Sequence, residues 1–256
     1  MSPAEAPSAR SSKRGIFVTF EGGEGSGKST QSALLKEALE ARGRRVIRLR
    51  EPGGTKLGED LRQVLLNSPG IDRTTELLLF LAARAELVAK TIRPALRDGI
   101  NVVCDRFIDS TAAYQGYGRG IDLELIRALN KTAIGDAVPD LTVLLDIEPD
   151  KGLSRVSKGS GGDAIEGHWQ AELSFPENEG IKGKRVGGRD LAFHETVRAG
   201  YRELAEAEPQ RWLVLDATRP AAELSAAILE RVDALAATQR PRRPARATTG
   251  QPLLPT

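Results

Sequence analysis

Short apolar segments alternate with longer segments of helical periodicity along most of the chain. Five of the short segments predict strands, and they span residues 15–21, 45–50, 101–104, 141–147 and 212–215. Between them, apolar residues recur three and four positions apart, as in helices that bury one face. Strands that are largely apolar and separated by helices indicate an α/β fold, in which helices cover both faces of a parallel sheet.

Three features of the helical segments add detail to this pattern. The first predicted helix ends at Gly43, and the apolar face of the second consists of Leu57, Leu61, Val64 and Leu65. A long helix is predicted from about Thr74 to Arg97. The segment 159–188 breaks the alternation, because it holds eight glycines and has no apolar periodicity. A loop of this length is typical of a functional lid or of a disordered segment.

Composition limits the class of protein. A length of 256 residues with 40% apolar residues fits one large α/β domain, and the single cysteine excludes an intrachain disulfide. A reducing, cytoplasmic location is therefore expected. No eighteen apolar residues run together, so no membrane span is expected. We predict a disordered N-terminal tail (1–14), a folded domain (15–238) and a basic, proline-rich tail (239–256).

The basic tail accounts for the positive charge of the chain. The net charge is +2, and four arginines without an acidic residue follow position 239. The rest of the chain therefore carries no net positive charge, and nucleic-acid binding by the folded domain is not expected. Two interpretations of the tail stay open: a solvated end, or a weak contact site for nucleic acid or another anionic partner.

A phosphate-binding motif follows the first predicted strand. Residues 22–29, Gly-Gly-Glu-Gly-Ser-Gly-Lys-Ser, fit the pattern G-x-x-x-x-G-K-[ST] between a strand and a helix. Glycines let successive backbone N–H groups point at phosphate oxygens, and the helix N-terminus favours an anion. In this motif Lys28 reaches the β- and γ-phosphates and Ser29 offers its hydroxyl to Mg²⁺. The expected ATP site comprises Gly22, Gly23, Glu24, Gly25, Ser26, Gly27, Lys28, Ser29 and Thr30.

The motif alone does not separate a kinase from a GTPase or a mechanical ATPase. The guanine-reading pattern Asn-Lys-x-Asp is incomplete here, because the segment 130–133 reads Asn-Lys-Thr-Ala. Asp105 and Arg106 end the third predicted strand, near the phosphate loop. Arg106 can hold a monophosphate through two parallel hydrogen bonds, and Asp105 offers a hard oxygen to Mg²⁺. Glu24, an acid among phosphates, requires a cation, for which Arg106 is the candidate.

Two residue pairs on predicted helices can each share one helix face. Phe80 and Arg84 are four positions apart, so one face presents a ring for stacking and a fork of donors. Thr111 and Tyr114 are three positions apart and can also share a face. The structural alternatives are a core ring with a surface cation for the first pair, and ordinary helix packing for the second.

Several short motifs in order, together with the phosphate loop, strongly resemble bacterial thymidylate kinases of the nucleoside monophosphate kinase group. They are Arg-Glu-Pro-Gly-Gly-Thr at 50–55, Phe-Leu-Ala-Ala-Arg at 80–84, Asp-Arg at 105–106, Ser-Thr at 110–111 and Tyr-Gln at 114–115. The resemblance covers about residues 15–233. It implies a three-layer P-loop fold with a five-stranded parallel sheet and a lid. It also implies phosphoryl transfer from ATP to dTMP with Mg²⁺, and a homodimer formed through helices.

The resemblance also assigns expected roles to residues. Phe80 stacks on thymine and Arg84 contacts a base carbonyl, while Thr111 lies at the base edge and Tyr114 packs against the sugar. Pro52 shapes the acceptor pocket, and whether its peptide bond is cis stays open. The full expected dTMP site is Glu51, Pro52, Phe80, Arg84, Arg106, Ser110, Thr111, Tyr114 and Gln115. The expected catalytic group is Glu24, Lys28, Arg106 and Arg185, with Ser29 and Asp105 as metal ligands.

The lid is where the chain departs from the family pattern. Family members without an arginine in the phosphate loop carry transfer cations in the lid, expected here at about 158–189. Gly-Leu-Ser-Arg at 152–155 and Leu-Ala-Phe-His at 191–194 match the lid-flanking motifs. Between them Lys-Arg-Val-Gly at 184–187 keeps an arginine but loses two carboxylates, and a long insertion precedes it. Arg185 is expected to act in transfer and Arg155 on the adenine side, with Lys158, Lys182, Lys184 and Arg189 as other candidate cations.

Three alternatives follow from these observations. The insertion is either a neutral surface expansion or a modified lid that alters closing or partner contacts. The acceptor could be another nucleoside monophosphate. A more distant alternative is a nucleotide-gated ATPase binding module, which would have no acceptor pocket; the Phe80 and Arg84 pair argues against it.

Overall fold

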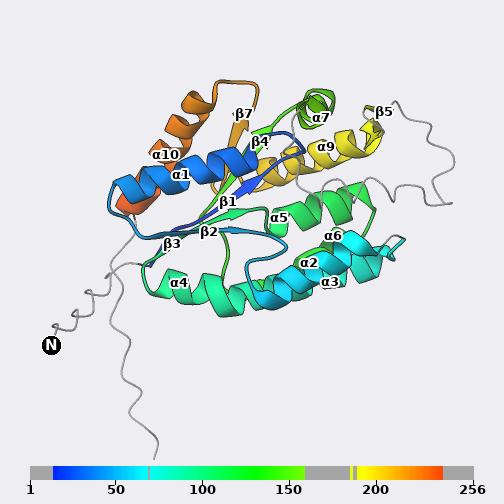
Figure 1. Ribbon diagram of the computed structural model, residues 1–256, viewed down its shortest axis with the longest axis horizontal. Helices are drawn as coiled ribbons and strands as arrows, with labels where there is room; N and C mark the ends of the chain where they lie inside the picture. The colour runs from blue at the N-terminus through cyan, green and yellow to red at the C-terminus, as the bar shows by residue number, and fades with distance from the viewer. Residues whose placement is uncertain (1–13, 69, 159–184, 187–188, 239–256) are drawn as a thin grey trace, which may run out of the picture.

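A computed structural model of the chain describes residues 14–68, 70–158, 185–186 and 189–238. Five parallel strands form one sheet in the order β2-β3-β1-β4-β7 (Figure 1). Their bounds are β1 Phe17–Glu21, β2 Val46–Arg50, β3 Asn101–Asp105, β4 Leu141–Asp146 and β7 Trp212–Asp216. The predicted five-stranded parallel sheet is therefore confirmed, with the strand of the phosphate-loop motif at its centre.

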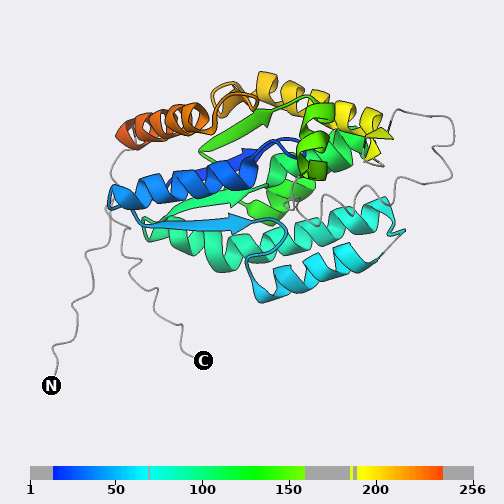
Figure 2. The same cartoon turned by 45° about the horizontal axis from the view of Figure 1, so that its top comes forward.

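Helices cover both faces of the sheet, which gives three layers. On one face α1 (Lys28–Ala41) and α10 (Ala221–Thr238) lie side by side (Figures 1 and 2). Val18 and Phe20 of β1 belong to the core that these two helices form. Phe17 belongs to the core on the opposite face. Because side chains alternate along a strand, β1 is buried on both faces, as its apolar sequence predicted.

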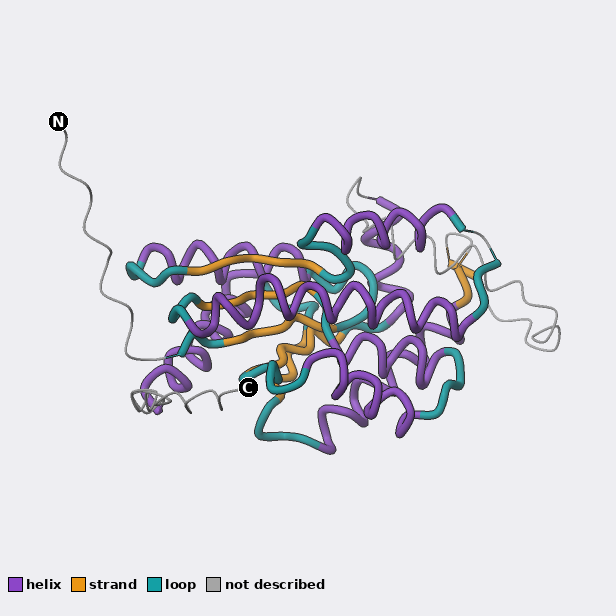
Figure 3. Tube along the Cα trace, turned by 90° about the horizontal axis from the view of Figure 1, so that it is seen from below, coloured by secondary structure: helices purple, strands orange, loops and turns teal. Residues whose placement is uncertain are grey.

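The opposite face is covered by a larger set of helices, which run alongside the strands in Figure 3. They are α2 Lys56–Asn67, α3 Arg73–Leu87, α4 Arg93–Arg97, α5 Ile108–Thr111, α6 Leu123–Ile134 and α9 Leu191–Ala207. The helix α7 (Pro149–Lys158) follows β4, and a short antiparallel pair, β5 (Arg185–Val186) and β6 (Arg189–Asp190), precedes α9. In the part of the chain that the structure describes, no helix is long and apolar enough to cross a membrane.

The apolar face predicted for α2 is partly wrong. Leu65 is buried, but Leu57 and Val64 are exposed. Arg62 occupies a buried position of this helix instead, and its Nη1 donates to the Pro52 carbonyl (3.1 Å). The spacing of apolar residues does not show that the aliphatic part of an arginine side chain is buried at this position.

The predicted long helix over 74–97 contains a π-helical turn, η1 (Val88–Ile92), between α3 and α4. The backbone stays helical at the junction, where Val88 has φ −63° and ψ −47°. Pro94, which has no N–H to donate, stands in the first turn of α4. The chain therefore continues in one direction, but the hydrogen-bond spacing changes before the proline. A second π-helical segment, η2 (Ala112–Gly118), follows α5 and affects the site described next.

Candidate functional site

The phosphate-loop motif connects the carboxyl end of β1 to the start of α1. Gly22 has φ 135° and Gly25 has φ 62°, a region that glycine adopts readily. A Cβ at Gly25 would lie 2.1 Å from the Gly152 carbonyl oxygen, so α7 packs too closely for any side chain there. Lys28 Nζ donates across the loop to the carbonyls of Gly22 (3.1 Å) and Gly23 (2.8 Å). The loop thus has the compact, lysine-bridged form that a phosphate cradle requires.

Ser29 and Asp105, predicted as metal ligands from different parts of the chain, lie together. Ser29 Oγ donates to Asp105 Oδ2 at 2.5 Å, because α1 starts beside the carboxyl end of β3. A hydroxyl and a carboxylate at the edge of the phosphate loop are hard oxygen donors of the kind that Mg²⁺ prefers. The residues present therefore fit a magnesium site.

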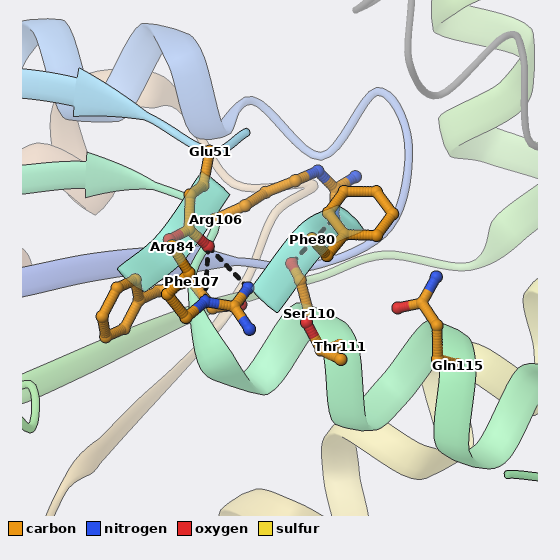
Figure 4. A pocket seen from close by; sticks show the side chains of 8 residues that line it. All are labelled: Glu51, Phe80, Arg84, Arg106, Phe107, Ser110, Thr111 and Gln115. Atoms are coloured by element: carbon orange, nitrogen blue, oxygen red, sulfur yellow. Dashed lines mark hydrogen bonds and ion pairs between the residues drawn. The ribbon is translucent and has the colours of Figure 1, made fainter. Parts of the chain in front are cut away.

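A pocket lies at the same edge of the sheet (Figure 4). Its lining residues are Glu51, Phe80, Arg84, Arg106, Phe107, Ser110, Thr111 and Gln115. Seven of them belong to the expected dTMP site, and Phe107 was not expected. Pro52 and Tyr114, which were expected there, are not among these lining residues. The Glu51–Pro52 peptide bond is cis.

Arg84 forms a rigid wall of the pocket. It is only 1% exposed, so the alternative of a surface cation is wrong. Its Nε and Nη2 donate to Glu51 Oε2 (2.8 and 2.5 Å), and Nη2 also donates to the Phe107 carbonyl (3.1 Å). Burial raises the pKa of the Glu51 carboxyl, and the charge of Arg84 opposes this rise. This fully buried ion pair holds the guanidinium in one orientation.

Asn130 completes the environment of Arg84, a role that the sequence did not predict. Its Oδ1 accepts from Arg84 Nη1 at 2.6 Å. Asn130 lies four residues from both Ile126 and Ile134, and all three are buried on α6. The sequence feature that could have predicted this role is an amide side chain in line with the apolar positions of the helix. A polar group buried at such a position requires a hydrogen-bond partner.

Arg106 follows β3 directly, in a left-handed backbone conformation with φ 68°. Its Nη1 donates to Ser110 Oγ (3.1 Å) and its Nη2 donates to the Tyr114 hydroxyl (3.2 Å). The guanidinium carbon lies 4.9 Å from the centre of the Tyr114 ring. Arg106 thus reaches the pocket while Tyr114 supports its side chain, which places a positive charge beside the phosphate loop.

The π-helical segment η2 changes which side chains share a face. Thr111 and Gln115 both line the pocket, whereas Tyr114 is 1% exposed and packs against Phe193 and Tyr201 (ring centroids 6.2 and 6.3 Å apart). Tyr114 therefore contacts the pocket through Arg106, whose Nη2 donates to its hydroxyl, and its predicted place beside the sugar stays a prediction. A π-helix has more residues per turn than an α-helix, so the next residue after Tyr114 takes the expected position.

Glu21, at the end of β1, is a buried acid that sequence reasoning missed. Its Oε1 accepts from the Phe107 backbone N–H (2.8 Å), and its Oε2 accepts from Ser110 Oγ (2.5 Å) and the Tyr201 hydroxyl (2.9 Å). Burial and the nearby charge of Asp109 raise the pKa of Glu21 to about 7, although the hydrogen bonds from Ser110 and Tyr201 and the charge of Arg106 oppose the rise. The sequence feature that could have identified Glu21 is a carboxylate at the last position of a mostly apolar strand. Glu21 ties the turn after Arg106 to β1.

The raised pKa of Glu21 predicts a pH-dependent stability. Between pH 4.5 and pH 7 the folded chain binds more protons at Glu21 than the unfolded chain does, so the free energy of unfolding falls as pH rises through this window. The fall attributable to Glu21 should be about 3 kcal/mol. We expect chemical denaturation at pH 4.5–8 to show that the Glu21→Gln variant lacks this component. Parallel pH curves for both proteins would contradict the assignment.

The remaining expected site residues come from the phosphate loop and the lid. Glu24 is 3% exposed. Arg155, on α7, is exposed and donates from Nη1 to the carbonyls of Gly25 (3.3 Å) and Ala217 (3.1 Å), which places it beside the phosphate loop. Arg185 lies on β5, which pairs with β6 just before α9. Lys182, Lys184, most of the insertion and both predicted tails except Arg14 lie outside the described residues; Arg14 pairs with Asp140 at 2.6 Å.

Comparisons with known proteins identify similar chains. The family model described as thymidylate kinase matches residues 20–170. The thymidylate kinase of Solidesulfovibrio magneticus is 52% identical over 207 residues, which are 79% of this chain and 91% of that protein. The thymidylate kinase of Deinococcus radiodurans is 46% identical over 216 residues, 84% of this chain and 95% of that protein. A crystal structure of thymidylate kinase from Ehrlichia chaffeensis, 34% identical, aligns with a TM-score of 0.65 over 86% of this chain and 99% of that one.

Proposed function

Because the chain belongs to the thymidylate kinase family, we propose that it transfers the γ-phosphoryl group of ATP to dTMP, which gives ADP and dTDP. The observation that carries this proposal is the pocket beside the phosphate loop, at the carboxyl edge of the sheet. This pocket combines a ring, Phe80, with two buried arginines, Arg84 and Arg106. A nucleotide-gated binding module has no need of such an acceptor pocket.

Phosphoryl transfer requires placement and charge neutralisation more than covalent chemistry. Lys28 and the backbone N–H groups of the loop hold the donor phosphates, and Arg106 holds the acceptor phosphate. The cis peptide at Pro52 and the Arg62 bond to its carbonyl shape the loop next to Glu51. Phe80 stacks on the base and Arg84 donates to a base carbonyl. Glu24 acts close to Arg106, on the acceptor side of the loop.

We further propose that Ser29 and Asp105 hold Mg²⁺ with the triphosphate. When bound, the ion neutralises phosphate charge as the γ-phosphoryl group moves. Arg155 contacts the adenine side and Arg185 supplies a cation to the moving group, as the family resemblance implies.

A homodimer formed through helices is also proposed. Large exposed apolar side chains on α2, α3 and α6 support it: Leu57 (47% exposed), Val64 (44%), Leu78 (52%) and Leu125 (49%). Exposed apolar side chains on neighbouring helices are typical of an interface between subunits. Light scattering on the purified chain tests this proposal, and a monomer at micromolar concentration would contradict it.

The function is tested by an ADP-release assay with Mg²⁺-ATP and one acceptor at a time. The acceptors are dTMP, dUMP, dCMP, UMP, AMP, GMP and none. We expect dTMP to give the highest kcat/KM. Equal ADP release with and without dTMP would contradict the kinase assignment. A preference for a different monophosphate would support a kinase with another substrate.

A further inference from the structure

Behind the pocket, three buried polar side chains form a chain of hydrogen bonds. Arg119 Nη2 donates to Glu76 Oε2 (2.8 Å), and Gln115 Nε2 donates to Glu76 Oε1 (2.7 Å). We propose that Arg119 and Glu76 are positioning residues that hold the Gln115 amide with its oxygen toward the pocket, so that the enzyme selects a pyrimidine with a hydrogen on N3. This inference rests on the proposed function, because it assumes that the pocket receives the base of a nucleoside monophosphate.

The direction of each hydrogen bond follows from chemistry. A guanidinium can only donate, and a carboxylate facing it can only accept. Glu76 therefore presents an acceptor to Gln115, and only the NH₂ group of that amide can face it. The reversed amide would place two oxygens against each other at about the same separation, with Glu76 1% and Gln115 2% exposed. Buried groups left in such a mismatch lose their hydrogen bond and keep their desolvation cost.

The remaining half of the amide faces the ligand. Gln115 lines the pocket, and in Figure 4 its oxygen points toward the other lining residues. Arg84, in the same pocket, can only donate. The pocket therefore offers both an acceptor and a donor to a base. Thymine and uracil present N3–H beside a carbonyl, which match this pair, whereas cytosine presents an N3 lone pair beside an amino group, which mismatches both.

The Glu76→Gln substitution tests this arrangement because it keeps the shape and changes the polarity. Arg119 still only donates, so the introduced amide must turn its oxygen toward Arg119 and its NH₂ toward Gln115. Gln115 then has to accept from it, and its own NH₂ turns into the pocket. The Gln115 side chain of the variant should no longer accept from the N3–H of thymine or uracil. It should instead donate to the N3 lone pair of cytosine.

We expect kcat/KM measurements on the full chain to show a loss of selectivity. The ratio of dTMP to dCMP should fall by about 100-fold or more, since one matched hydrogen bond is lost and another gained. The value for dUMP, which has the same N3–H, should fall together with that for dTMP. The Glu76→Asp variant keeps an acceptor there, so it should retain the ratio even if overall activity falls. An unchanged ratio in Glu76→Gln, or equal changes in both variants, would overturn the proposal.

Two controls separate this outcome from misfolding and from a wrong substrate. Glu76→Gln leaves the buried Arg119 without its anion, so a double variant with Arg119→Met restores neutrality and no longer fixes either amide. The ratio of kcat/KM for dTMP to that for dCMP should also fall in the double variant. Thermal unfolding shows whether the Glu76→Gln variant folds. If it does not, an unchanged ratio in the double variant would overturn the inference. If the unmodified chain does not use dTMP, the proposed function itself fails. If it uses dTMP and only the variant ratios stay constant, this inference alone fails.

Discussion

Replacement of Arg106 by alanine is expected to lower kcat/KM for dTMP by about 10²- to 10³-fold while the Kd for ATP changes little. Arg106 is 3% exposed, and its guanidinium is held by Ser110 and Tyr114 at the edge of the pocket. Truncation of a buried arginine that pairs with a phosphate weakens the binding free energy of the ligand by several kcal/mol. This corresponds to a loss of about 10²- to 10³-fold in affinity. Separate titrations of dTMP and ATP, followed by steady-state kinetics, measure the two effects.

The Arg106→Lys variant keeps the charge but loses the two-pronged geometry, so it should recover only part of the dTMP affinity. Arg93→Ala is a matched control, because Arg93 is a surface cation paired with Asp136 at 3.2 Å. Equal losses of dTMP and ATP affinity in Arg106→Ala would instead indicate a structural role. The variant has a second signature, since the charge of Arg106 lowers the pKa of Glu21. Its removal should move the upper end of the pH-dependent stability change to higher pH.

The sheet and the phosphate loop could be predicted because local sequence determines them. β1 and β4 are largely apolar since both faces are buried, and three glycines of the loop, Gly22, Gly25 and Gly27, have positive φ. The predicted buried face was wrong where a polar side chain, which the apolar pattern does not mark, occupies a buried position of the helix. Leu57 and Val64 looked like core residues but are exposed, while Arg62 is buried.

The residues that line the pocket were largely predicted, but the residues that support them were not. Motif order identified Phe80, Arg84 and Arg106, which the structure places around one pocket. The spacing of 3.6 residues per turn does not hold in the π-helical segment η2, so helical spacing alone could not tell which of its side chains line the pocket. Glu21 and Glu76 were missed because each meets its partners, such as Tyr201 and Gln115, only after distant segments pack together.

Replacement of Lys28 by alanine should lower kcat by about 10²- to 10³-fold, the cost of removing one preorganised donor from developing charge. Lys28 is 6% exposed and lies within hydrogen-bond distance of two loop carbonyls, so its ammonium is already fixed within the phosphate loop. The loss should appear in single-turnover measurements at saturating nucleotides, while dTMP binding stays within a few-fold of the unmodified chain. Lys36→Ala is the matched control, because Lys36 lies on the same helix but pairs with Glu40 on the surface.

The alternative outcome is equally informative about the loop. If Lys28→Ala weakened dTMP binding as strongly as turnover, the bonds of Lys28 to Gly22 and Gly23 would be holding the whole edge of the sheet in shape. Thermal unfolding distinguishes the two cases, since a lysine used for transfer leaves the transition temperature close to that of the unmodified chain. We expect the first result because the glycine conformations and the packing of α7 against Gly25 already fix the loop backbone. We therefore expect the lysine to act on the phosphates rather than to hold the loop in shape.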